Sequence, residues 1–259
     1  MKHLLSPSRP VKTSRDIVLL KISRARLLAV SCDAAGAVGS KRLDKVRTDP
    51  RLVGKMTARV ALMELLSIGA NPIAIIGTFS VEPEPTGNQV IEGIEEELRS
   101  SQLRDLKLLC SSEKNMKVDQ TGIGITAVGV VLSSAVKIAQ CEEGDEIIAV
   151  GKPYVGREVI HAEKHRMLPN TLDVMKLRRN RFVHELIPVG SKGILYEARL
   201  MAEDSKLFFE PLSSQQVDLK KSAGPATVLV SAIRKGSFAQ VKKALGAKPI
   251  GKIGTLRQR

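Results

Sequence analysis

The sequence predicts an α/β (α+β) fold made of two domains. Between Ser31 and Gly151, apolar β-branched runs alternate with amphipathic segments, as expected for strands followed by helices. After Gly151 the segments become shorter and more basic, which indicates a second unit. A chain of 259 residues can bury one substantial core or two modest ones. We therefore expect a loose N-terminal arm (residues 1–15), an N-terminal domain (residues 16–151) and a C-terminal α/β domain (residues 152–259).

The first half of the chain contains six predicted strands before the boundary and two helices. IVLLKIS and RLLAVSCD each end in turn residues, which is typical of strands. Residues 54–69 have helical spacing of apolar residues, and Gly69 occupies a helix-stop position. PIAIIGTFSV predicts a strand, and PTGNQVIEGIEEELRSSQ predicts an acidic helix. LKLLCSS and TGIGITAVGVVLS predict two further strands, and CEEGDEIIAVGKP predicts a turn that leads into a strand.

The second half predicts a smaller set of helices and strands. HAEKHRML and DVMKLRRNRFVHEL have basic, helix-like patterns. IPVGSKGILYEARLMAED predicts a turn and a helix, and LFFEP a short strand. DLKKSAGPATVLVSAI predicts a turn and a strand, followed by a helix at residues 237–245 and a last strand near residues 251–256.

The net charge of +14 belongs mainly to the two ends of the chain. Residues 1–26 carry +6 and residues 220–259 carry +10, whereas the stretch between them is −2. Basic ends are compatible with nucleic-acid binding. Aromatic residues make up only 3% of the chain, with no Trp, so few side chains are available to stack on nucleic-acid bases. A solvated basic surface is the simpler interpretation, and it disfavours nucleic acid as a partner.

The sequence contains no apolar run long enough for a membrane span, and its N-terminus has no apolar signal region. Its three cysteines, Cys32, Cys110 and Cys141, form no CxxC motif and cannot all pair with each other. Reduced cysteines favour a cytoplasmic location, with no membrane partner.

The most informative stretch is SCDAAGAVGSKRLDKVRTD, residues 31–49. An apolar run reaches Asp33, and a turn with Gly36 and Gly39, the cation Lys41 and the acid Asp44 follow. Backbone N–H groups, a cation and carboxylates in one loop suit a site for phosphate and a divalent metal. The spacing is not that of a P-loop, which needs four residues between its glycines and then Gly-Lys-Ser/Thr.

Three other positions belong to this prediction. Glu64 is bracketed by apolar residues, so its carboxylate needs an ion pair, hydrogen bonds or a metal; a structural ion pair with Arg59 or Lys55 is the alternative. Glu113 follows a strand, in Ser111-Ser112-Glu113-Lys114-Asn115. Lys192, between two glycines, opens a predicted helix, where free N–H groups can hold an anion.

The motif loop followed by VGKMTARVALMELLSIGANP resembles the ATP-binding superfamily of aminoimidazole ribonucleotide synthetase, thiamine-monophosphate kinase and selenophosphate synthetase. In that superfamily an Asp-rich loop precedes a helix that carries an acid and ends in Gly-Ala-x-Pro; here these are Glu64 and Gly69-Ala70-Asn71-Pro72. The family's Gly-Gly-Asp/Glu-Thr motif aligns with residues 111–114, where both glycines and the threonine are replaced. CSSEKN, TGIGITAVGVV, HELIPVGSKGILYE and KKSAGPATVLVS look most like the α-ribazole kinase branch.

The resemblance implies an aminoimidazole ribonucleotide synthetase-like two-domain fold whose N-terminal mixed sheet pairs in a homodimer. It implies a Mg²⁺–ATP site and transfer of the γ-phosphoryl group to a hydroxyl of α-ribazole or a related nucleoside, which would make α-ribazole 5′-phosphate for cobalamin lower-ligand assembly. Asp33 and Asp44 would be catalytic. Asp33, Asp44, Glu64 and Glu113 would bind metal, and the residues contacting nucleotide or substrate would be Gly36, Gly39, Lys41, Glu113 and Lys192.

Two alternatives remain open at this point. The chain could be another ATP-dependent synthetase or kinase of the superfamily, of the aminoimidazole ribonucleotide or thiamine-phosphate type. It could instead be a non-catalytic basic protein that binds nucleic acid. No general base is identified; Asp49 and Asp119 are both candidates.

Overall fold

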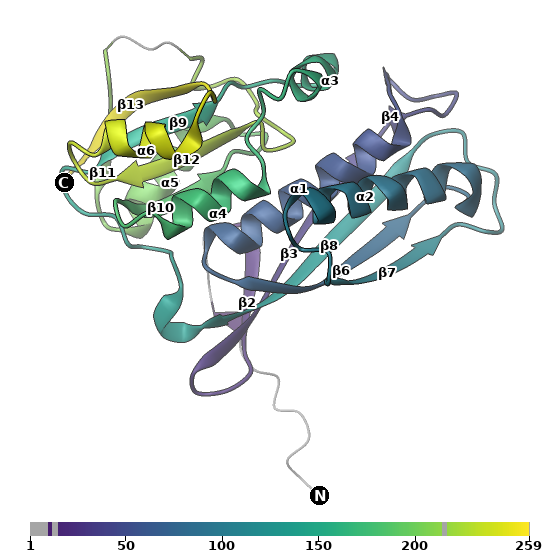
Figure 1. The fold of residues 1–259 in the computed structure, drawn as a ribbon, viewed down its shortest axis with the longest axis horizontal. Coiled ribbons are helices and arrows are strands. Elements are labelled where there is room, and N and C mark those ends of the chain that lie inside the picture. Colours follow the sequence, from purple (N-terminus) through teal and green to yellow (C-terminus); the bar gives the residue numbers. More distant parts are fainter. Residues whose placement is uncertain (1–9, 12–14, 214–216, 259) are drawn as a thin grey trace, which may run out of the picture.

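The computed structural model describes residues 10–11, 15–213 and 217–258, and it contains two sheets with helices packed against them (Figure 1). The predicted N-terminal arm, residues 1–15, lies almost entirely outside the described residues. Mixed α/β architecture is confirmed. No helix within the described ranges is both long and apolar enough to cross a bilayer.

The N-terminal sheet has six strands in the order β1-β2-β3-β8-β6-β7, and all neighbours are antiparallel except the parallel pair β6 and β7. Helices α1 and α2 lie over one face of this sheet (Figure 1). Its elements are β1 (Pro10–Val11), β2 (Ile17–Lys21), β3 (Arg26–Gly36), α1 (Pro50–Ser67), β6 (Asn71–Phe79), a π-turn (Pro83–Gly87), α2 (Asn88–Ser100), β7 (Lys107–Ser112), β8 (Gly122–Leu132) and a 3₁₀ turn (Ser133–Ala135). A short parallel pair, β4 (Val38–Gly39) and β5 (Val46–Arg47), lies in the loop before α1.

Helix α1 begins at Pro50, four residues before the predicted start. Asp49 caps it by accepting a hydrogen bond from the backbone N–H of Arg51, 2.8 Å away, and proline is well suited to the first helical turn. Gly69, with φ of +100°, follows the helix end as expected. Asp49 therefore has a structural role as a helix cap.

The close crossing of α1 and α2 depends on two glycines. A Cβ at Gly54 would collide with the carbonyl oxygen of Val90, and one at Gly93 would collide with that of Arg51. Each helix backbone thus lies directly against the other, which fixes their separation.

The C-terminal sheet has five strands in the order β10-β12-β9-β13-β11, with every neighbouring pair antiparallel. Helices α4 and α6 pack on one face together with part of α1, and α5 packs on the other face. The elements are β9 (Glu146–Gly151), α3 (Arg157–Lys164), α4 (Thr171–Arg179), β10 (Val183–Pro188), α5 (Ile194–Asp204), β11 (Phe208–Pro211), β12 (Val228–Ile233), α6 (Phe238–Leu245) and β13 (Ile250–Arg257).

Two predictions from the sequence are wrong here. Residues 146–151 were assigned to the N-terminal domain, but they form β9, the central strand of the C-terminal sheet, paired with β12 and β13. The change between sheets therefore falls between Leu132 and Glu146. The segment VHEL, assigned to a helix, forms part of β10, because pairing with β12 supplies its backbone hydrogen bonds.

A buried ion pair network joins the two units through α1. The guanidinium of Arg59, only 3% exposed, donates to Glu97 of α2 at 2.9 and 3.0 Å and to Glu163 of α3 at 2.7 and 2.8 Å. The second carboxylate oxygen of Glu97 accepts from the hydroxyl of Thr171 at the start of α4, 2.7 Å away. Burial opposes the charge of Glu163, but Arg59 and Lys55 outweigh it and lower its pKa to about 2.

We expect Arg59→Met to lower the free energy of unfolding by about 3–5 kcal/mol, because it leaves the fully buried carboxylate of Glu97 without its cation. Urea unfolding at pH 7 measures the effect. Arg51→Met on the same helix removes an exposed pair with Glu92 and should cost at most about 1 kcal/mol. Equal losses in the two variants would contradict the role given to Arg59.

Candidate functional site

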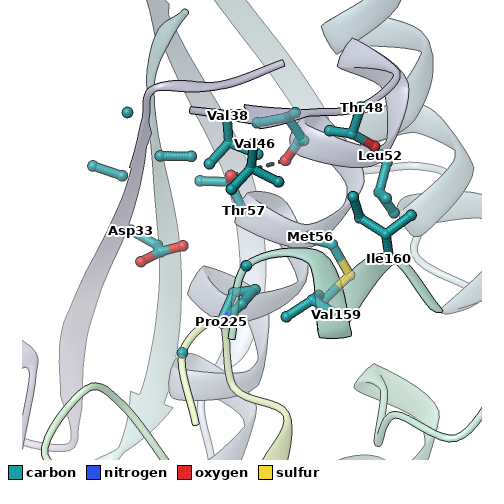
Figure 2. Close-up of a pocket in the computed structure, with 16 residues that line it drawn as sticks. Asp33, Val38, Val46, Thr48, Leu52, Met56, Thr57, Val159, Ile160 and Pro225 are labelled. Atoms are coloured by element: carbon teal, nitrogen blue, oxygen red, sulfur yellow. Dashed lines mark hydrogen bonds between the residues drawn. The ribbon is translucent and has the colours of Figure 1, made fainter. Parts of the chain in front are cut away.

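The main candidate site is a cavity of about 310 Å³ between the two units (Figure 2). Its wall on the N-terminal side comes from the end of β3, from β4 and β5 and from the first turns of α1. Helix α3 and the turn at Gly224-Pro225 close it from the C-terminal side. Most of the lining is apolar, with Val38, Val46, Leu52, Val53, Met56, Val159, Ile160 and Pro225 contributing. The carboxylate of Asp33 is the only charged group in the lining.

Asp33 lies on β3, on the side that faces α1. Strand alternation places it in line with Ser31, whose hydroxyl donates to the carbonyl of Ala61 in α1, 2.7 Å away. Burial raises the pKa of Asp33 to about 6, while the backbone N–H of Ala34 acts in the opposite direction. No ion pair involving Asp33 occurs among the described residues. A carboxylate in this position is suited to a cationic ligand.

A second cavity, of about 550 Å³, opens beside the first. The two share Ala34, Ala35 and Gly36, so they meet at the end of β3. The second cavity is more polar and carries the hydroxyls of Thr78, Ser80, Ser111 and Ser112 and the carboxylate of Glu113. Its floor includes Gly124, where a Cβ would lie 3.0 Å from the hydroxyl of Thr78.

Glu113 is placed in this second cavity by its own loop. Its carboxylate accepts from the backbone N–H of Asn115 at 2.7 Å and from that of Met116 at 3.2 Å, and these bonds lower its pKa. Gly36 lines both cavities, whereas Glu113 lines only the second one and follows β7, three strands away from the β3 strand that carries Asp33.

Asp44 has a different position from the one expected. It is 8% exposed, and its carboxylate accepts from the backbone N–H and the hydroxyl of Thr121 and from the backbone N–H of Lys41, at 2.7 to 2.8 Å. A Cβ at Gly39 would clash with the side chains of Thr121 and Asp44. These contacts fasten the glycine-containing loop to the start of β8. The catalytic and metal-binding role of Asp44 stays a prediction; in the structure its carboxylate holds the loop, and Gly39 packs against the same group.

Lys41 does not line either cavity. Its ammonium forms an ion pair with Glu82, in the loop after β6, and Glu82 also accepts from the hydroxyl of Thr86. Glu82 was missed because it lies 41 residues from its partner, with no motif connecting them. Asp119, a candidate base, pairs with Arg42 at 2.9 Å on the surface.

Glu64 and Lys192 lie together in a third, much smaller cavity of about 60 Å³, which also contains Arg15, Asp16 and Glu197. Burial, Asp16 and Glu197 raise the pKa of Glu64 well above its usual range, and Asp33 adds to the effect. Lys192 donates to the hydroxyl of Tyr196, 3.1 Å away. The proposed ion pair of Glu64 with Arg59 or Lys55 does not form, because both of those cations bind Glu163.

The four predicted metal ligands do not form one cluster. Asp33, Glu64 and Glu113 line three different cavities, and Asp44 is held by the loop. Within the described ranges, no group of three or more His, Cys, Asp or Glu side chains is arranged to hold a metal ion. The residues present suit a metal that arrives already bound to a ligand, because such an ion needs only one or two protein carboxylates.

Residues 14–131 match the family described as "AIR synthase related protein, N-terminal domain". The match covers nearly all of the first sheet and the helices that pack on it and ends before the C-terminal sheet. No curated protein sequence matches the chain.

The fold of nearly the whole chain is similar to solved structures of thiamine-monophosphate kinase and of HypE. Thiamine-monophosphate kinase from Stenotrophomonas maltophilia K279a superposes with a TM-score of 0.65 at 15% identity, covering 96% of this chain and 89% of that one. HypE from E. coli, a hydrogenase maturation protein, gives a TM-score of 0.66 at 17% identity, covering 89% and 80%. A HypE structure in complex with ATP gives 0.65 at 15% identity, covering 95% and 80%. The protein therefore has the AIR synthase-like fold, and these likenesses do not distinguish the α-ribazole kinase branch.

We expect Asp33→Asn to stabilise the protein at pH 7 but not at pH 4. The carboxyl has a pKa of about 6 in the folded state against an ordinary value of 3.8, so its stabilising contribution is present below pH 3.8 and is lost as the pH rises through 6. Asparagine does not ionise. The difference in unfolding free energy between variant and wild type should grow by about 2 kcal/mol from pH 4 to pH 7, measured by urea unfolding in EDTA. A difference that does not change with pH would contradict the burial of this carboxylate.

Proposed function

We propose that the protein is an ATP-dependent kinase that transfers a phosphoryl group to a hydroxyl of an uncharged nucleoside, with α-ribazole as the first candidate. The observation that carries this proposal is the junction of a polar cavity and an apolar cavity at residues 34–36, beside Asp33. Phosphoryl transfer mainly requires that two ligands meet in line and that their charge is neutralised. The two cavities share residues 34–36, although Asp33 faces α1 and the polar residues Thr78 and Ser111 are in register on the other face of the sheet. The end of β3 is therefore the place where the two ligands would approach each other.

The polar cavity is the proposed site for the nucleotide. Its hydroxyl groups can donate to phosphate oxygens, and its glycine-containing floor lets a ligand approach the backbone closely. The complex of HypE with ATP, which has the same fold, supports a nucleotide in this role. Ser111 and Ser112 stand where the superfamily motif has two glycines. This replacement fits the proposal, because both serines contribute hydroxyls to this cavity.

Magnesium is proposed to arrive with the nucleotide. Mg²⁺ usually keeps several waters and binds substrate phosphates plus one or two carboxylates. Asp33 fits one such position, since it is buried without an ion pair partner among the described residues, and Glu113 stands at the other cavity. The metal would neutralise phosphate charge, and the chain's own part is to hold these carboxylates at the strand end.

The apolar cavity is the proposed site for the acceptor. Its lining contains no Lys, Arg or His, and its single charge is the acid Asp33. An acceptor that is itself a phosphate ester would bring negative charge to Asp33 without a compensating cation in the lining. A neutral nucleoside brings no negative charge to Asp33, and it can bury its aromatic base against Leu52, Met56 and Ile160. This favours α-ribazole over a thiamine-phosphate type of acceptor.

A homodimer formed through the N-terminal sheet is also proposed. The face of the sheet away from α1 and α2 exposes Val18 and Leu109, which are 48% and 68% exposed, and strand alternation adds the side chains of Val30, Ile76 and Val128. An apolar sheet face of this kind is typical of an interface. Sedimentation velocity on Val30→Glu should show a shift from dimer to monomer, and a wild-type monomer would exclude the proposal.

The decisive experiment is turnover of α-ribazole with Mg²⁺–ATP, with ADP and the 5′-phosphate detected by mass spectrometry. Asp33→Asn should lower the rate at least 100-fold while circular dichroism shows an intact fold, and Asp105→Asn, on the surface, should not change it. Turnover of thiamine phosphate or of an aminoimidazole ribonucleotide precursor, with none of α-ribazole, would favour the alternative superfamily activity.

Ile160→Trp tests which cavity holds the acceptor. The larger ring fills part of the apolar cavity, so the KM for the nucleoside should rise at least 10-fold while the KM for ATP stays within twofold. Ala239→Trp, on the exposed side of α6, is the matched control. A rise in the KM for ATP alone would reverse the assignment of the two cavities.

A further inference from the structure

The exposed side of α4 and the turn before α6 gather basic side chains on one surface, which we name the α4–α6 basic face. It consists of Lys176 and Arg179 of α4, Arg181 in the turn after it, and Arg234 and Lys235 before α6, and all five are exposed. The two segments are more than fifty residues apart in the sequence. They meet because β10 and β12 are neighbours, with Val183 paired to Ile233 (Figure 1).

The charges on this face are not compensated by acids. None of the five takes part in an ion pair with a carboxylate in the part of the chain that the structure describes. Two acids near this face, Asp173 and Asp145, already bind other side chains. The carboxylate of Asp173 accepts from the backbone N–H of Asn170, the N-cap of α4, and pairs with Lys248 at 3.6 Å. The carboxylate of Asp145 binds His184 at 2.8 Å. A surface of this kind has a strongly positive potential.

Phe182 holds two of the cations close to each other. The guanidinium carbon of Arg181 lies 4.9 Å from the ring centroid and that of Arg234 lies 5.8 Å from it. Cation–π contacts order these side chains, and two like charges on one ring repel each other unless an anion lies between or beside them. The arrangement therefore favours an anion that both guanidinium groups can contact.

The face continues along α4 into a groove. Helices α4 and α6 lie side by side, and a cavity of about 480 Å³ at the start of α4 is lined by Arg166 and Lys176. Its other charged groups are already paired, Lys248 with Asp173 and both Lys55 and Arg59 with Glu163. The nine residues of α4 rise about 13 Å. That length corresponds to about four base-pair steps of about 3.4 Å each, measured along the axis of a duplex. The cations thus form a track rather than a point site.

The composition of the face distinguishes between possible polyanions. None of the large apolar side chains that are exposed within the described ranges lies on α4 or α6. A protein interface needs apolar or aromatic anchors at its centre, whereas a phosphate backbone needs only cations. Single-strand binding relies on exposed aromatic rings, and the chain is only 3% aromatic. We propose that the α4–α6 basic face binds the phosphate backbone of double-stranded nucleic acid without reading its sequence.

This proposal changes the expectation drawn from composition, in which the basic ends were a solvated surface. Two cations of the basic C-terminal end, Arg234 and Lys235, lie beside three from the middle of the chain, on the side of the C-terminal sheet that carries α4 and α6. It lies away from the cavity between the units, which is lined by α3 and the turn at residues 224–225 but by no residue of α4 or α6. Binding there is independent of the proposed kinase activity.

The test is fluorescence anisotropy with labelled 20-base-pair DNA and RNA duplexes between 25 and 300 mM KCl. We expect both to bind, with the logarithm of affinity falling against the logarithm of salt concentration with a slope of about −4. The triple variant Arg179→Glu, Arg181→Glu, Arg234→Glu should weaken binding at least 30-fold at 50 mM KCl. The control Arg24→Glu, Arg104→Glu, Arg199→Glu changes exposed arginines elsewhere and carries the same net charge, so it should stay within threefold.

The proposal would be overturned by no binding at 25 mM KCl, by an equal loss in the control triple variant, or by competition by polyglutamate as strong as that by duplex. The last would indicate an acidic protein as the partner. Circular dichroism and thermal unfolding establish that each variant is folded, and a Gln triple variant at the same three positions replaces the Glu variant if it does not fold. Binding to RNA but not to DNA would also count against recognition of the backbone alone.

Discussion

The buried guanidinium of Arg59 is the interaction on which the relation between the two units depends. A single side chain from α1 is held by carboxylates from α2 and α3, and one of those carboxylates also binds the start of α4. Each charge is removed from water, so each is stable only while the others are present. Helix α3 carries Val159 and Ile160, which close the apolar cavity. The same network that joins the units therefore determines where the cavity wall lies.

The acids around the first loop have different functions despite their closeness in the sequence. Asp44 and Asp49 hold backbone N–H groups, and Glu82 neutralises Lys41. Asp33 pairs with no cation among the described residues, and burial raises its pKa. Loop acids that already have strong partners stabilise the local structure, which leaves Asp33 as the carboxylate most available to a ligand.

Local patterns predicted more of this molecule than long-range relations did. The strands of the first sheet and the end of α1 follow from apolar alternation and from Gly69, which act over a few residues. Residues 146–151 belong to the C-terminal sheet because they pair with β12 and β13, which lie about 80 to 100 residues later in the chain. The sequence around residues 146–151 therefore cannot indicate to which sheet they belong. The same reason separates Asp33 and Gly36, which line the apolar cavity, from Asp44 and Lys41, which do not. The roles of the latter two depend on Thr121 and Glu82, which are distant in the chain.

The close approach of α1 and α2, where Gly54 lies against Val90 and Gly93 against Arg51, has a consequence for the shape of the apolar cavity. Residues 52, 53, 56 and 57 of α1 form one side of that cavity, while Gly54 faces the other way, against α2. Any side chain at position 93 would push on the backbone of Arg51 and so displace this part of α1. The size of the cavity therefore depends in part on Gly93 having no side chain, although α2 contributes no residue to the cavity lining. Selectivity for a ligand could be altered there without changing a single contact residue.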